Sequence, residues 1–367
     1  MISEHASPLA AVGGADAGGQ NVHVAELATA LARRGHAVTV FTRRDSPDPS
    51  DAVGFAPGVT VRHVPAGPAR PLPKDDLLDY MPAFARWLAG RWSVQPPDVA
   101  HAHFWMSGIA AVCAARQCPV PVVQTFHALG RVKRRYQAEA DASPPQRPAV
   151  EATVAQRASA IIATCTDEVA ELTAYGAGPD TMYVIPCGVD SDRFHPGPGA
   201  AGPYSPARVL TLGRLVPRKG NDTVIEAIAR VPGVELLIVG GPAHDQFDGD
   251  PEVRRLRQAA AACGVAERVR FAGRVAHRDV PALLRSADVV VSAPWYEPFG
   301  IVPVEAMACG TAVVATAVGG HLDTVDHEVT GLLVPPRDPA ALAGALAQLL
   351  ADPGRRRALG TAAAARA

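Results

Sequence analysis

The 367-residue sequence predicts an α/β protein made of two Rossmann-like domains with parallel sheets. Three observations lead to this prediction. Apolar, β-branched runs alternate with helical patterns along the chain, the alternation restarts after one stretch rich in proline and glycine, and the length suits two domains of about 100–200 residues each. We expect the two sheets to face each other across a cleft that binds ligands at the carboxyl ends of the strands.

The first half begins with a glycine-rich stretch and an amphipathic helix. From Val24, apolar residues recur at the i, i+3, i+4 and i+7 positions of a helix predicted over 21–34, which Gly35 ends. Strands are predicted at 37–41, 59–64, 99–101, 120–124, 160–163 and 182–185. Only residues 1–3 are available for the strand that a doubly wound domain needs ahead of its first glycine-rich loop.

The stretch 196–206 is predicted to link a first domain, 1–195, to a second domain, 207–367, because it is rich in proline and glycine and offers little to pack. The second half predicts strands at 209–212, 235–239, 269–271, 289–292 and 312–315, and helices at 222–230, 252–263, 280–285, 302–309 and 339–351. Residues 360–367 stand where a further helix is expected to begin.

Composition excludes several classes of partner. The chain has 35 basic and 36 acidic residues and a formal net charge of −1, so no overall attraction to nucleic acid or an anionic membrane is expected. Its six cysteines form no C-x-x-C pair, which favours reduced thiols. No leader pattern and no apolar run of ~20 residues is present, so we expect a cytoplasmic protein without a transmembrane segment. The oligomeric state cannot be predicted from these features.

The glycine-rich stretch Gly13-Gly14-Ala15-Asp16-Ala17-Gly18-Gly19 leads into the first helix. Glycines at a helix start let backbone N–H groups approach an anion, and the helix dipole favours negative charge there. The stretch is neither G-x-G-x-x-G nor a P-loop, since it lacks the P-loop lysine. A flexible turn is the alternative interpretation.

A second candidate is the loop 213–220, between a predicted strand and a predicted helix. It carries Arg214 and Lys219, and Pro217 stiffens it. A guanidinium can bind phosphate oxygens in a bidentate manner, and an ammonium acts as a point charge, so the two cations suit a diphosphate. A solvated basic loop is the alternative.

Two carboxylates follow the strand predicted at 289–292. Glu297 lies in a loop and Glu305 in the next helix, eight residues on. Carboxylates accept hydrogen bonds from sugar hydroxyls, and the backbone amides of Phe299, Gly300, Ile301 and Val302, at the helix start, suit a phosphate. Two ordinary surface carboxylates are the alternative.

Histidines follow two strands of the first half, in His101-Ala102-His103-Phe104 and in Gln124-Thr125-Phe126-His127. A zinc site needs three or four ligands, and no third ligand stands at a telling spacing, so no metal is predicted. The acidic triplets 190–192 and 248–250 are interpreted as turn residues rather than as a metal-binding D-x-D.

Taken in order, these motifs resemble family 4 of the retaining GT-B glycosyltransferases, among them sucrose-phosphate synthases and D-inositol-3-phosphate N-acetylglucosaminyltransferases. The resemblance covers nearly the whole chain and is carried by GGQNVHVAELATALARRGHAVTVFTR, HAHFWMSG, VVQTFHALG, VIPCGVDSDRF, LGRLVPRKG and EPFGIVPVEAMACGTAVVATAVGGHLDTV. The E-x7-E motif of Glu297 and Glu305, together with Arg214 and Lys219, is highly specific.

The resemblance implies a role for each matching residue. His127 would lie beside the anomeric carbon, Arg214 and Lys219 would neutralise the leaving diphosphate, and Glu297 would hold hydroxyls of the transferred sugar. The donor would further be bound by Gly18, Gly19, Arg274, Val275, Phe299, Gly300, Ile301, Val302 and Glu305, and the acceptor by Lys74, Phe104 and Arg147.

The implied function is retaining, metal-independent transfer of glucose or N-acetylglucosamine to a small sugar phosphate, polyol or aminocyclitol, without a cofactor. The donor is a nucleoside diphosphate sugar, which the resemblance implies is UDP-linked. Phe104 and Ala128 replace a tyrosine and a threonine of the inositol-phosphate enzymes, which argues against inositol phosphate as acceptor. The family's C-terminal helix, which crosses back to the first domain, is not expected here. Two alternatives remain: a sugar-nucleotide epimerase of the same fold, and a non-catalytic protein that binds sugar nucleotides.

Overall fold

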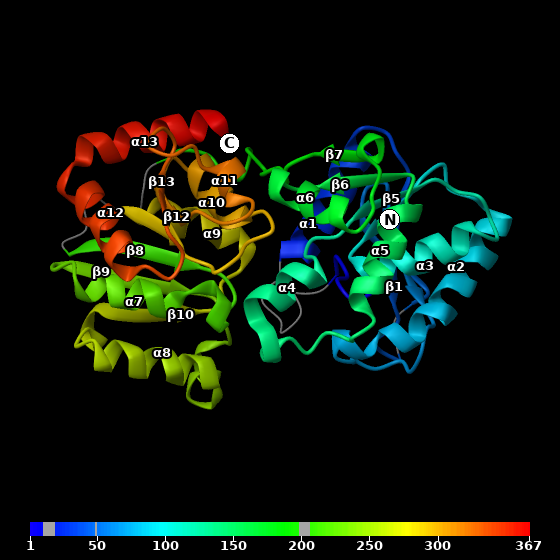
Figure 1. Cartoon of the computed structure of the whole chain (residues 1–367), viewed down its shortest axis with the longest axis horizontal. Coiled ribbons are helices and arrows are strands. Elements are labelled where there is room, and N and C mark those ends of the chain that lie inside the picture. Colours follow the sequence, from blue (N-terminus) through cyan, green and yellow to red (C-terminus); the bar gives the residue numbers. More distant parts are fainter. Residues whose placement is uncertain (10–18, 48–49, 198–205) are drawn as a thin grey trace. The chain divides into compact units, whose positions relative to one another are not determined.

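The structure is a computed structural model that describes residues 1–9, 19–47, 50–197 and 206–367. It divides into two compact units, unit 1 (Met1–Pro186) and unit 2 (Cys187–Ala367), each with its own buried apolar core (Figure 1). Most of the predicted linker lies outside the described residues, so its bounds stay a prediction. Among the described residues, no helix combines the length and apolar composition needed to cross a bilayer.

Unit 1 contains two groups of strands that its first residues join. One group is the parallel series β4 (Ala100–His103), β5 (Val122–Thr125), β6 (Ala160–Ala163) and β7 (Met182–Val184). The other has β3 (Val59–Val64) in the centre, parallel to β1 (Val38–Arg43) and antiparallel to β2 (Ala52–Ala56). Ile2 forms parallel bridges to Phe41 of β1 and to Ala102 of β4. Residues 1–3 thus take the strand position predicted for them.

The helices of unit 1 are α1 (Gly19–Arg33), α2 (Met81–Val94), α3 (Trp105–Ala115), α4 (Gly130–Gln137), α5 (Arg147–Arg157) and α6 (Thr166–Ala174). In α2, Phe84, Leu88 and Trp92 recur every fourth residue and are almost fully buried. They therefore share one helix face, which belongs to the same apolar core as Trp105 of α3. Burying each such side chain stabilises the fold by about 1.5–3 kcal/mol.

Unit 2 is a six-stranded parallel sheet with the order β10-β9-β8-β11-β12-β13. Its strands are β8 (Ala207–Leu212), β9 (Val234–Val239), β10 (Val269–Gly273), β11 (Val289–Ser292), β12 (Ala312–Thr316) and β13 (Leu332–Val334). Its helices are α7 (Asn221–Ala229), α8 (Pro251–Ala262), α9 (Val280–Arg285), α10 (Ile301–Ala308), α11 (His321–Thr324), α12 (Pro339–Ala351) and α13 (Pro353–Arg366).

The strand order places the ligand-binding edge of unit 2. From β8 the chain runs outward through β9 to β10, then returns to the other side of β8 as β11. Parallel sheets of this kind bind ligands outside the carboxyl ends of the strands, where the order reverses. In unit 2 this switch point lies between β8 and β11. In unit 1 the switch point lies between Ile2 and β4. Strands β1 and β3 lie on one side of Ile2, and the series from β4 to β7 lies on the other side.

Most predicted strands and helices are present, with ends shifted by one or two residues. Helices α2 to α6 and α11 and strands β2 and β13 were not predicted. At the C-terminus the expectation was wrong, because α13 begins at Pro353 and Gly360 lies inside it. A Cβ at Gly360 would lie 2.2 Å from the carbonyl oxygen of Gly310, so glycine there allows α13 to pack against the chain that precedes β12.

Candidate active site

Two loops meet by backbone contact at the switch point of unit 2. The loop after β8 ends at Gly220, which has φ = 68°, and a Cβ there would lie 2.0 Å from the carbonyl oxygen of Ala293, just after β11. Only glycine permits this approach. The segment that carries Arg214 and Lys219 is thereby held against the segment that leads to Glu297.

Lys219 and Glu297 form an ion pair at this point, between Nζ and Oε2. Their side chains are only 23% and 13% exposed, so both charges are largely withdrawn from water. Burial alone would raise the pKa of the Glu297 carboxyl, but the Lys219 ammonium, with Arg218 and His321, lowers it to about 2. Burial lowers the pKa of Lys219, and Glu297 opposes that shift. The structure thus brings together two predicted residues that are 78 positions apart.

Arg214 adds a third group to this cluster. Its side chain is exposed on the same loop, and its charge further lowers the pKa of Lys219. The next basic residue, Arg218, lies over the ring of Tyr296 at 5.2 Å, and its buried nitrogen NH1 has no hydrogen-bond partner within the part of the chain that the structure describes. Arg218 was not predicted as a site residue, although it stands next to Lys219 in the sequence.

The start of α10 lies at the same edge. Gly300 precedes the helix with φ = 91°, and the first two helical amides, of Ile301 and Val302, have no acceptor within the helix. Gly320 donates its N–H to the Glu297 carbonyl at 3.0 Å, and a Cβ on Gly320 would lie 2.3 Å from the Cα of Phe299. This backbone packing fixes the helix start, where amides and dipole favour an anion.

Glu305 is a buried residue of α10 and has a partner, His277, that the sequence did not suggest. An arginine can only donate, so Arg193, 2.9 Å from His277 Nδ1, makes that nitrogen an acceptor. His277 therefore carries its proton on Nε2 and donates it to Glu305 Oε1 at 3.1 Å. Burial is the main influence on the Glu305 carboxyl and raises its pKa. After β10, Arg274 is exposed and Val275 packs against the core.

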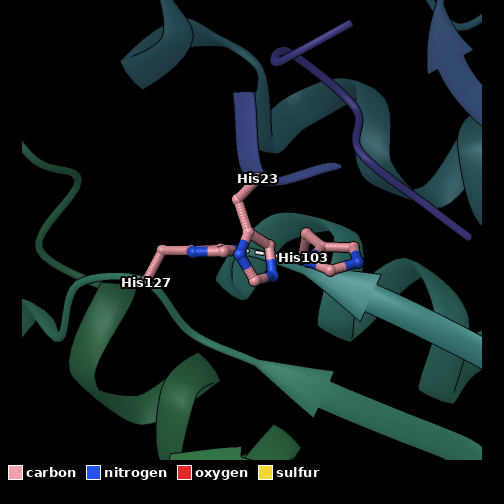
Figure 2. Close-up of side chains that lie close together, drawn as sticks. All are labelled: His23, His103 and His127. Atoms are coloured by element: carbon pink, nitrogen blue, oxygen red, sulfur yellow. Dashed lines mark hydrogen bonds between the residues drawn. The ribbon is translucent and has the colours of Figure 1, made fainter. Parts of the chain in front are cut away.

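The switch point of unit 1 gathers histidines from three elements (Figure 2). His103 ends β4, His127 follows β5, and His23 projects from α1. His103 Nδ1 lies 3.0 Å from His127 Nε2, and the His23 ring centroid is 5.1 Å from that of His127. His23 was not predicted, because it stands on a helix far from both histidine motifs in sequence.

These three imidazoles are neutral at physiological pH. Burial lowers the pKa of His23 to about 4 and that of His103 and His127 well below the ordinary value. Each further histidine in the cluster makes protonation of its neighbours harder. The cluster therefore offers hydrogen-bonding groups rather than positive charge.

Two more residues at this switch point were missed by the sequence analysis. Glu4 is 1% exposed and its carboxylate accepts from Ser107 of α3, while His5 Nδ1 lies 2.6 Å from its other oxygen. The His5 ring packs edge-on to Phe104 at 4.9 Å. Glu4 and His5 directly follow residues 1–3. Once residues 1–3 are assigned to a strand, their position predicts polar side chains at the carboxyl end of the sheet.

The predicted acceptor residues are only partly brought together. The Arg147 guanidinium lies 5.1 Å from the Phe104 ring centroid, and Phe104 has φ = 78°. Arg147 is 2% exposed and is bound by the Glu151 carboxylate at 2.7 Å and the Ala128 carbonyl at 2.7 Å. Lys74 lies on another segment and pairs with Asp75 at 2.8 Å. Arg147 thus has a structural role that its sequence position did not reveal.

The glycines of the first loop are described only in part. Gly18 lies outside the described residues, together with the rest of 10–18. Gly19 is the first residue of α1. The next side chain, Gln20, donates to the His103 carbonyl at 3.4 Å and so ties the helix start to the histidine cluster.

A metal site can be assessed at the same cluster. His23, His103 and His127 each offer a nitrogen, and these atoms all lie within 4.8 Å of one another. Metal-bound histidines usually donate their other ring N–H to an acceptor. His103 Nε2 is buried without such a partner among the described residues, so the fit of a metal ion is incomplete.

The acidic triplet 248–250 ends at Asp250, which caps α8 by accepting hydrogen bonds from the backbone N–H groups of Glu252 and Val253, as a turn residue would.

Comparisons with known proteins identify the family. A family model described as Glycosyltransferase Family 4 matches residues 17–193, and one described as Glycosyl transferases group 1 matches residues 202–366. A D-inositol 3-phosphate glycosyltransferase from Acidothermus cellulolyticus is 41% identical over 97% of this chain and 83% of its own length. The chain belongs to the GT-B glycosyltransferases of family 4.

Solved structures agree with the fold of this glycosyltransferase. A sucrose-phosphate synthase from Thermosynechococcus elongatus matches with a TM-score of 0.92 and 35% identity, over 100% of this chain and 92% of the other. HepE from Anabaena, in complex with UDP and glucose, matches with a TM-score of 0.77 and 23% identity, over 99% of this chain and 92% of the other. The predicted two-domain GT-B fold and the family resemblance are confirmed, and the roles of individual site residues remain predictions.

Proposed function

We propose that this glycosyltransferase moves glucose or N-acetylglucosamine from a nucleoside diphosphate sugar, UDP-linked by resemblance, to a small sugar phosphate, polyol or aminocyclitol. The donor binds unit 2 at the switch point between β8 and β11. The acceptor binds unit 1 near the histidine cluster. The reaction retains the anomeric configuration and needs no metal.

One observation carries the proposal: the contact of Lys219 with Glu297 beside exposed Arg214 and the start of α10. Breaking a glycosyl–phosphate bond places negative charge on the leaving diphosphate. Two cations and the two helix amides that have no acceptor within α10 are suited to stabilise that charge in the transition state, the role that a metal ion plays elsewhere. The ionised Glu297 carboxylate next to them can accept hydrogen bonds from the sugar.

In this proposal the anomeric configuration is retained because the acceptor attacks the anomeric carbon from the same face that the diphosphate leaves. The acceptor oxygen forms the new bond to the anomeric carbon as the bond to the phosphate oxygen breaks, and the acceptor proton passes to the phosphate. This route needs no protein nucleophile. It is supported by the engagement of two carboxylates at the switch points, since Glu297 pairs with Lys219 and Glu4 with Ser107 and His5.

The acceptor proposal follows two relatives, one named for D-inositol 3-phosphate and one for sucrose phosphate. Both names contain a phosphorylated polyol or sugar. Phe104 and Ala128 offer no side-chain hydroxyl, so the proposal favours a phosphorylated acceptor other than D-inositol 3-phosphate. Arg147 lies over the Phe104 ring, but its guanidinium is buried and paired with Glu151, so the preference for an anionic acceptor rests on the relatives.

A product assay tests the proposal. The protein is incubated with UDP-glucose or UDP-N-acetylglucosamine in EDTA, with and without a panel of sugar phosphates and polyols, and UDP release, product mass and anomeric configuration by NMR are measured. Acceptor-dependent UDP release with retention is expected, and Arg214→Ala should abolish most of it. An inverted product refutes same-face attack, donor conversion without acceptor indicates an epimerase, and tight binding without turnover indicates a binding protein.

A further inference from the structure

His103 is a buried residue that the proposed reaction does not yet use. It ends β4, where it pairs in register with Thr125 of β5, and His127 follows two residues later. This register carries the two imidazoles to the same edge of the sheet. Their ring planes lie 26° apart with centroids at 5.3 Å, and His103 Nδ1 faces His127 Nε2 at 3.0 Å (Figure 2).

His127 has a backbone conformation that needs support from its surroundings. Its φ is 62°, in the left-handed region that residues other than glycine rarely adopt. Such a conformation persists where neighbouring contacts hold it. His127 is contacted by His103, through the hydrogen bond between His103 Nδ1 and His127 Nε2, and by the edge of the His23 ring.

The hydrogen bond between two neutral imidazoles requires one donor and one acceptor. His103 Nε2 is fully buried and has no hydrogen-bond partner among the described residues. A proton on that nitrogen would be an orphaned N–H, which is a rarer and costlier buried polar group than an acceptor without a partner. The proton of His103 is therefore favoured on Nδ1, where it can be donated to His127 Nε2.

We propose that His103 is a positioning residue that fills the Nε2 lone pair of His127 and so places the His127 proton on Nδ1. His127 then presents an N–H donor, and no free lone pair, to an oxygen of the bound sugar. It acts as a fixed hydrogen-bond donor rather than as a general base. The tautomer assignment stands on the contact between the two rings and on the burial of His103 Nε2, and only its kinetic consequence rests on the proposed glycosyl transfer.

The tautomer can be observed without any activity. In the full chain with ¹⁵N-labelled histidine, two-bond proton–nitrogen correlations distinguish an Nδ1-protonated from an Nε2-protonated ring, and the His127→Asn spectrum assigns the signals. We expect Nδ1–H for His127. Nε2–H on His127 in the native protein overturns the proposal, whatever the kinetics show.

Variants at His103 separate positioning from simple packing. The side-chain amide nitrogen of asparagine occupies about the position of Nδ1 of histidine. The side-chain amide nitrogen of glutamine lies nearer the position of Nε2. His103→Asn should keep Nδ1–H on His127 and a nearly native kcat. His103→Gln should populate both His127 tautomers and lower kcat by ten- to a hundred-fold, the size expected from a misplaced group, with a smaller change in KM. Equal kcat values for two folded variants would overturn the proposal.

His63→Gln is the matched control. His63 is also a buried strand histidine of unit 1, 7% exposed, and its Nδ1 donates to a backbone carbonyl, that of Ser50, at 2.9 Å. Its loss removes an imidazole of the same kind without touching His127. We expect the native His127 tautomer and kcat in this variant. If wild-type protein transfers no sugar, the proposed function fails, while the NMR result still decides the tautomer.

Discussion

Replacing Lys219 with methionine removes the cation that keeps the Glu297 carboxylate ionised inside unit 2. The pKa of Glu297 falls from 4.5 to about 2 in the folded protein. Each pKa unit corresponds to about 1.4 kcal/mol, so the fold stabilises the ionised form by about 3 kcal/mol relative to the protonated form. Because the folded pKa is lowered, this stability is present above pH ~4.5 and is lost as the pH falls toward 2.

The variant loses the part of this stabilisation that Lys219 provides, because the Glu297 carboxylate keeps only Arg218 and His321 as favourable neighbours. Removing one partner of a buried ion pair costs about 3–5 kcal/mol. Glu297→Gln should cost less, because its remaining partner, Lys219, is the more exposed of the two and can turn toward water. In the double variant, Lys219→Met with Glu297→Gln, no unpaired charge remains, and we expect it to be more stable than Lys219→Met alone.

Hydrogen exchange at increasing denaturant concentration, read by mass spectrometry, measures the opening free energy of each unit in the full chain. Peptides of unit 1 serve as the internal control, and Arg218→Met removes a neighbouring cation as a matched substitution, with an expected loss of about 1 kcal/mol from its contact with Tyr296. A loss below about 1 kcal/mol in unit 2 for Lys219→Met, or a double variant no more stable than that single variant, would refute the reasoning.

Three further predictions concern binding and turnover. Arg214→Ala should lower kcat by on the order of 10²–10³, since one preorganised cation at the diphosphate is lost; steady-state UDP release checks this, and a change below threefold contradicts the role. Gly320→Ala places a Cβ 2.3 Å from the Phe299 Cα, so unit 2 should lose about 1–3 kcal/mol and bind UDP more weakly by calorimetry, and native values would contradict the packing argument. Phe104→Tyr combined with Ala128→Thr should raise kcat/KM for D-inositol 3-phosphate, relative to a second acceptor, by about two- to tenfold per restored hydrogen bond. An unchanged ratio of kcat/KM values would show that these two positions do not select the acceptor.

Much of the fold is encoded locally. The periods of apolar residues in segments such as 209–212 and 339–351 suffice to place strands and helices, and the family motif Glu297 to Glu305 with Lys219 identifies the class of enzyme. At the C-terminus the predicted start of the last helix differed from the observed start at Pro353. There, only Asp352 separates α12 from α13, and Gly360 serves a close backbone approach rather than a helix start.

What the sequence determined by itself is the alternation of elements, the two-domain division and the loops that carry Arg214, Lys219 and Glu297. What only the tertiary structure decided is which distant side chains meet. His23 joins His103 and His127, Glu4 reaches Ser107, and Arg147 is bound by Glu151. The reason is physical: local patterns fix the period of a segment, whereas neighbours across a sheet depend on strand order and on the switch points that this order creates.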